Sequence, residues 1–188
     1  MDYKKITRVL TTSISIGLCF ILSSCATVSQ SAQYYRQAYQ QAKRKNYDTA
    51  FLKLRALLLN DPRSPYAPRA KFSTGEYYYD KEDYADAILT FYEYINEYPE
   101  DSGRVFAELI IYKISTEIKT NKYLQFKERD LIEKIEKKIF SKPMFFLFFD
   151  KEKSYTFRSA FGNVYTALEY VDKVEVRRNG DYFLEISP

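Results

Sequence analysis

Apolar residues spaced three and four positions apart mark amphipathic helices in the middle of the chain. Such a stripe gives a helix one face that packs against a neighbour. One stripe is Ala50, Leu54, Leu57 and Leu58, and the next is Ala87, Ile88, Phe91 and Ile95. Together with the segments before them, the pattern predicts helices over residues 34–44, 47–59, 68–80 and 84–98.

These helices form two copies of one repeat, 37 residues apart. In each copy a small residue stands 12 positions before an alanine, which stands 12 positions before a proline. The residues are Ala38, Ala50 and Pro62 in the first copy and Gly75, Ala87 and Pro99 in the second. This spacing is typical of tetratricopeptide repeats, in which small residues let two helices pack closely and proline ends the second.

Two repeats rarely bury their own apolar faces, so further elements must cap them. Residues 104–119 fit the first helix of a third repeat. Its second helix is degenerate, because Leu124 and Glu136 stand where alanine and proline are expected. A charged helix over about residues 123–140 is predicted to cap the array, with Leu131, Ile135 and Ile139 on its apolar stripe.

The last third of the chain changes to a β pattern. Segments 155–161, 164–171, 174–178 and 181–186 are rich in Tyr, Phe, Thr and Val. Asn179-Gly180 is a strong hairpin signal, and a type I′ turn there would pair Arg178 with Asp181. We expect three or four antiparallel strands packed on the last helices. The apolar run 144–149 is more often a buried strand, although it could dip into a bilayer. The predicted fold class is therefore mainly α (α+β), a helical solenoid followed by a small sheet.

The N-terminus resembles a bacterial lipoprotein signal. Lys4, Lys5 and Arg8 precede an apolar stretch over residues 9–22 that is too short for a confident transmembrane helix. Residues 22–25, Leu-Ser-Ser-Cys, resemble a lipobox, which predicts cleavage after residue 24 and acylation of Cys25. An uncleaved N-terminal anchor is the alternative. Ala26 follows, and the absence of aspartate there resembles default sorting to the outer membrane.

Composition excludes much catalytic chemistry. The 188 residues include no histidine and only two cysteines, so no histidine base, nucleophile partner or metal ligand exists. Cys19 would leave with the signal and Cys25 would carry lipid, which leaves no thiol for redox chemistry. A formal charge of +4 does not predict nucleic-acid binding. We expect no enzyme activity, cofactor or metal.

The best candidate for function is the concave face of the repeats, which their first helices line. The repeat register places an aromatic set there, and tyrosine suits contact with an extended peptide because it is rigid and amphipathic. The predicted peptide-binding groove is Tyr35, Arg36, Tyr39, Arg69, Phe72, Glu76 and Tyr79. Alternatively, several of these side chains simply pack between helices.

Specific motifs resemble one family. Residues 61–67, Asp-Pro-Arg-Ser-Pro-Tyr-Ala, the triplet 77–79, segment 83–88 and Phe91 to Pro99 resemble the BamD (YfiO) lipoproteins of the outer-membrane β-barrel assembly machinery. The resemblance covers the lipobox and roughly residues 34–119, but the further repeats of that family are not found. The Ser-Pro-Tyr linker typical of the family accounts for the long period.

The resemblance implies a lipid-anchored protein on the periplasmic face of the outer membrane. Its partners would be proteins of the assembly machinery or unfolded outer membrane proteins. The alternative is a periplasmic scaffold for a secretin, pilus or cell-wall complex, and a cell-wall hydrolase would rest on location alone. The expected organisation is a signal peptide (1–24), a lipidated tether (25–33), a helical domain (34–141) and a β-rich module (142–188).

Replacing the predicted lipidation site tests the anchor. Cys25→Ser removes the only thiol that the lipobox offers, so the chain should remain unprocessed or be mislocalised. Metabolic labelling with a fatty acid should be lost in this variant. Labelling equal to that of the parent would contradict the prediction that the protein is a lipoprotein acylated at Cys25.

Overall fold

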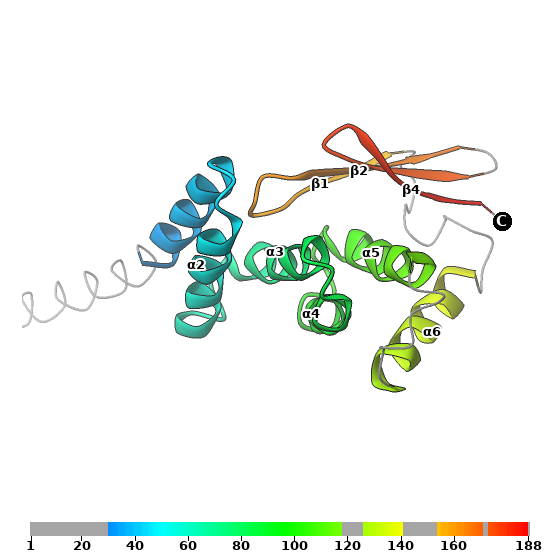
Figure 1. Ribbon diagram of the computed structural model, residues 1–188, viewed down its shortest axis with the longest axis horizontal. Helices are drawn as coiled ribbons and strands as arrows, with labels where there is room; N and C mark the ends of the chain where they lie inside the picture. Colours follow the sequence, from blue (N-terminus) through cyan, green and yellow to red (C-terminus); the bar gives the residue numbers. More distant parts are fainter. Residues whose placement is uncertain (1–29, 118–125, 141–153, 171–172, 188) are drawn as a thin grey trace, which may run out of the picture.

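A computed structural model describes residues 30–117, 126–140, 154–170 and 173–187 (Figure 1). A helix over residues 30–43 comes first. It is followed by α2 (Tyr47–Asn60), α3 (Ala67–Asp80), α4 (Tyr84–Glu97), α5 (Arg104–Glu117) and α6 (Phe126–Phe140). The strands are β1 (Ser154–Arg158), β2 (Val164–Glu169), β3 (Val174–Arg178) and β4 (Asp181–Ile186). The predicted signal, Cys25 and the run 144–149 lie outside the described residues.

The 37-residue period recurs in the backbone itself. Helices α3 and α5 begin 37 residues apart, as do α2 and α4. Asn46 and Asp83 cap the second helix of each repeat, each accepting a hydrogen bond from the backbone N–H three residues later. Before each cap, Lys45 and Glu82 adopt the same left-handed φ of 60°. The helices therefore form a repeat-like array, with bounds within a few residues of the predicted ones.

Close approach of the paired helices explains the small residues. Ala50 and Ala87 have no exposed surface. A Cβ atom added at Gly75 would lie 2.8 Å from Cε1 of Phe91, so glycine at this position lets the Phe91 ring of α4 press against α3. The array ends at α6, which packs on α4 and α5 and buries Leu131 and Ile135. None of the described helices is long and apolar enough to cross a membrane.

The strands form one antiparallel sheet in the order β1-β2-β3-β4. Asn179 and Gly180 have φ values of 57° and 91°, which fits the predicted type I′ turn, and Arg178 pairs with Asp181. One residue of β4 is extra, because Val176 and Arg177 pair with Leu184 and Tyr182. This bulge lets the neighbouring side chains of Phe183 and Leu184 both be buried.

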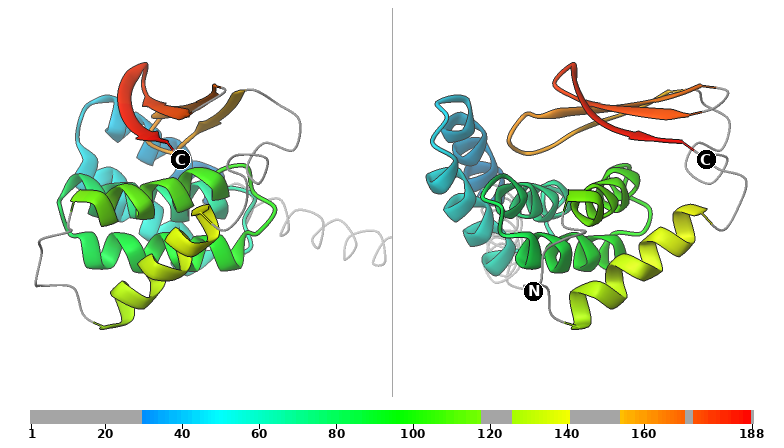
Figure 2. Two further views of the ribbon diagram at one scale, coloured as in Figure 1. Left: turned by 90° about the vertical axis from the view of Figure 1, so that its right-hand side faces the viewer. Right: turned by 45° about the vertical axis from the view of Figure 1, so that its right-hand side comes forward.

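The sheet packs on α3 and α5, so the predicted packing on the last helices is correct for α5 and wrong for α6. It lies over α3 and α5, while α6 lies away from it at the far end of the array (Figures 1 and 2). The ring of Phe72 in α3 lies 4.6 Å from that of Phe157 in β1, and Phe106 in α5 lies 5.7 Å from Tyr165 in β2. Helices and sheet thus share one core.

Two leucines of α2 test the helical register. Leu54 has no exposed surface, whereas Leu52 in the same helix is 63% exposed. Leu54→Ala should lower the free energy of unfolding by about 2–5 kcal/mol, because it leaves a cavity in the core. Leu52→Ala should change it by less than about 0.5 kcal/mol. Chemical denaturation measures both, and equal losses would mean that the helix faces are wrongly assigned.

Candidate functional site

The first-repeat end of the predicted groove keeps some surface open to solvent. Arg36 and Arg69 are exposed, while Tyr35 and Tyr39 are partly buried. The Tyr35 ring stacks on Tyr66 with centroids 4.9 Å apart. Partial burial raises the pKa of the Tyr35 hydroxyl, an effect that the adjacent Arg69 guanidinium opposes. The structure therefore brings Tyr35 and Arg69 together, and Arg36 is exposed on the same helix as Tyr35.

The second-repeat end is closed by the sheet. Phe72 and Glu76 have no exposed surface, so the prediction that these two side chains contact an outside peptide is wrong for this fold. The sheet covers both: Phe157 and Tyr165 contact the Phe72 ring, and the Tyr165 hydroxyl donates to Glu76. Tyr79 is only partly covered: its ring contacts Phe183 in β4, and its hydroxyl donates to Glu117.

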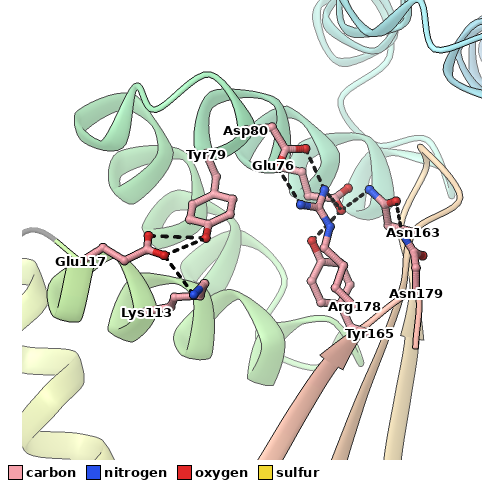
Figure 3. Close-up of polar contacts among 9 residues, drawn as sticks. All are labelled: Glu76, Tyr79, Asp80, Lys113, Glu117, Asn163, Tyr165, Arg178 and Asn179. Atoms are coloured by element: carbon pink, nitrogen blue, oxygen red, sulfur yellow. Dashed lines mark hydrogen bonds and ion pairs between the residues drawn. The ribbon is translucent and has the colours of Figure 1, made fainter. Parts of the chain in front are cut away.

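A polar network ties the sheet to α3 (Figure 3). The Tyr165 hydroxyl donates to Glu76 Oε1 at 2.7 Å, and Asn163 Nδ2 donates to the same atom at 3.1 Å. Arg178 Nη2 lies 3.6 Å from Glu76 Oε1. Arg178 also forms a bidentate ion pair with Asp80, in which Nη1 donates to Oδ1 at 2.6 Å and Nη2 to Oδ2 at 2.7 Å. The guanidinium therefore bridges two carboxylates one helical turn apart in α3.

Burial makes the charge of Glu76 costly unless a cation pairs with it. Burial raises the pKa of Glu76, and the Arg178 charge and the Tyr165 hydrogen bond act against that rise. Among the described residues, Glu76 Oε2 and Arg178 Nε have no hydrogen-bond partner. A carboxylate in this position is stable only while its cation stays in place.

Two asparagines connect the hairpin tip to the loop between β1 and β2. Asn179 Oδ1 accepts from the Val164 backbone N–H at 2.8 Å, and Asn179 Nδ2 donates to Asn163 Oδ1 at 2.8 Å. The same loop is also held by α3, because the Ala160 N–H donates to Ser73 Oγ at 2.8 Å. The contacts position the sheet on the helices, and this arrangement suits attachment rather than proton transfer.

Sequence reasoning missed Asn163 and Tyr165 and assigned Arg178 only to a strand pair. These residues contact Glu76 across at least 87 positions of sequence, and no local pattern marks such a pairing. Glu76, which the repeat register predicts in the groove, was the one usable signal, because an acid that becomes buried there requires a partner. Among the described residues, no group of three or more His, Cys, Asp or Glu could hold a metal ion.

Comparison with known families gives one match. The family model described as YfiO, outer membrane lipoprotein, matches residues 28–137. The chain belongs to the YfiO outer membrane lipoprotein family. This membership confirms the resemblance read from the repeat motifs. The YfiO match spans the helical array and ends before β1, so the sheet lies beyond it. Searches of curated proteins and of solved structures gave no match.

Two neighbouring arginines test the network. Arg178 has 18% of its side chain exposed and faces Glu76, whereas Arg177 has 45% exposed and pairs with Glu175. Arg178→Gln should lower the free energy of unfolding by about 3 kcal/mol at pH 7, because it leaves Glu76 without a cation. Arg177→Gln should cost less than about 0.5 kcal/mol.

The loss in Arg178→Gln should depend on pH. Removing the cation raises the already elevated folded-state pKa of Glu76 further, so protonation relieves the folded state. The penalty is therefore smallest near pH 4.5 and below, and it grows as the pH rises toward 7. Urea denaturation across this range measures it. A penalty independent of pH would show that the charge of Glu76 is not what Arg178 stabilises.

Proposed function

We propose that this protein is a lipid-anchored outer membrane protein that faces the periplasm and binds protein partners in the assembly of β-barrel outer membrane proteins. The YfiO match over residues 28–137 carries the proposal, since it covers the helices that form the repeats. The lipobox at residues 22–25 supports the anchor. Repeats of this kind bind partners through their surfaces and require no catalytic group.

The remaining groove surface lies close to the anchor. Residue 30 is five positions after Cys25, and five residue-to-residue steps span at most about 18 Å. The first helix and its exposed side chains therefore stay near the membrane surface. Arg36 and Arg69, together with the stack of Tyr35 on Tyr66, offer cations beside aromatic rings. This combination suits a protein segment that carries acidic and aromatic side chains.

Copurification from crosslinked cells tests the proposal. The full-length protein should recover barrel-assembly components or unfolded barrel proteins. The double variant Arg36→Ala and Arg69→Ala should reduce that recovery at least about fivefold, because both arginines are exposed in the open part of the groove. Its matched control, Arg129→Ala with Arg177→Ala, removes two exposed arginines elsewhere and should recover as much as the parent.

Recovery of secretin, pilus or cell-wall synthesis proteins without any barrel-assembly component would overturn the proposal and favour the scaffold alternative. Equal loss in both double variants would indicate a general charge effect, and the groove assignment would then be wrong.

A further inference from the structure

A cavity of about 580 Å³ opens where the sheet meets the helices. It is formed by the start of α2, the end of α3, the loop between β1 and β2, and the β3–β4 hairpin. Five aromatic rings line it: Tyr47, Tyr77, Phe161, Tyr182 and Phe183. Tyr47 and Tyr182 are 41% and 67% exposed, so the aromatic lining reaches solvent.

Both cations that line this cavity are already paired. Arg178 holds Asp80, and Lys81 lies 3.0 Å from Asp48. A ligand that brings a carboxylate or phosphate would therefore compete with existing ion pairs. An uncharged aromatic side chain would instead stack on the rings without disturbing them, which makes it the favoured occupant.

Strand β4 runs from this cavity along the edge of the sheet. It is the last strand in the order and pairs only with β3. Among the described residues, no backbone hydrogen bond outside the β3 ladder involves Asp181–Ile186. The strand contains neither proline nor lysine, two residues that often protect such edges. Its outward N–H and C=O groups match the backbone of an extended chain.

We propose that β4 and the cavity together bind an extended protein segment, which adds to β4 as a further strand and places one aromatic side chain in the cavity. The inference rests on the proposed function, because strands of barrel proteins alternate polar and apolar residues and carry aromatic residues at the membrane interfaces. The site uses the sheet, which lies beyond the YfiO match and apart from the groove.

Synthetic peptides of nine residues with alternating polar and apolar positions and one tyrosine provide the probe. Fluorescence anisotropy would follow binding to the full-length lipoprotein in nanodiscs. Replacing the peptide tyrosine with serine should weaken binding at least about tenfold, as loss of an aromatic anchor does. Methylation of alternate backbone nitrogens gives two isomers. Edge addition uses one side of the peptide, so one isomer should bind like the parent and the other should lose binding.

Two exposed tyrosines of the sheet provide a matched pair of variants. Tyr182 lines the cavity, whereas Tyr170 follows the end of β2 at the opposite end of the sheet and is 45% exposed. Tyr182→Ala should weaken binding of the parent peptide at least about tenfold. Tyr170→Ala should change it less than about twofold. Circular dichroism and the melting temperature should be unchanged in both, because neither side chain is buried.

Three results would overturn this inference. Equal binding of the two methylated isomers would exclude strand addition, and unchanged binding to Tyr182→Ala would exclude the cavity. If the protein dimerises through β4 and the peptide does not displace the second copy, the edge binds another copy of this chain instead. The proposed function is tested separately. If the peptides bind as expected but no barrel-assembly component is recovered from cells, the assembly role is refuted and the binding site stands.

Discussion

The concave face of the helical array is built around Phe72, and most of the fold follows from the need to cover it. This ring contacts Phe91 and Tyr94 from α4 and Phe157 and Tyr165 from the sheet, with centroids between 4.6 and 5.6 Å apart. A helical array this short cannot bury such a face by stacking more repeats. The sheet supplies the missing surface, which is why helices and strands share one core.

Aromatic packing alone would not choose one position of the sheet on the helices. Glu76 lies one turn beyond Phe72 and has to be paired, because a buried carboxylate without partners is strongly destabilising. Tyr165, Asn163 and Arg178 meet it only when the hairpin tip lies over the end of α3. The network therefore adds specificity to a contact whose stability comes mainly from apolar burial.

This arrangement redistributes the surfaces that can bind partners. Where the sheet covers α3, strands of the same chain occupy the space in which the groove would hold a peptide. Surface open to solvent remains around Arg36 of the first helix and Arg69 of α3, and at the junction beside β4. The first lies within the YfiO match, and the second involves the sheet beyond it. The chain thus combines helices that match the YfiO family with a sheet that covers part of their surface.

Local patterns in the sequence determined the elements. The apolar stripes of the helices and the Asn179-Gly180 turn each depend on neighbours within a few positions, so periodicity and turn chemistry predict them. Residues 30–33 are helical although the predicted helix begins at 34, because the polar segment before Tyr34 has no apolar period to mark it. What occupies the groove was decided only in the tertiary structure. Glu76 meets Tyr165 across 89 residues, and Ser73 meets Ala160 across 87. Such pairings depend on how segments far apart in the sequence pack together. The pattern of residues within one segment carries no information about that packing.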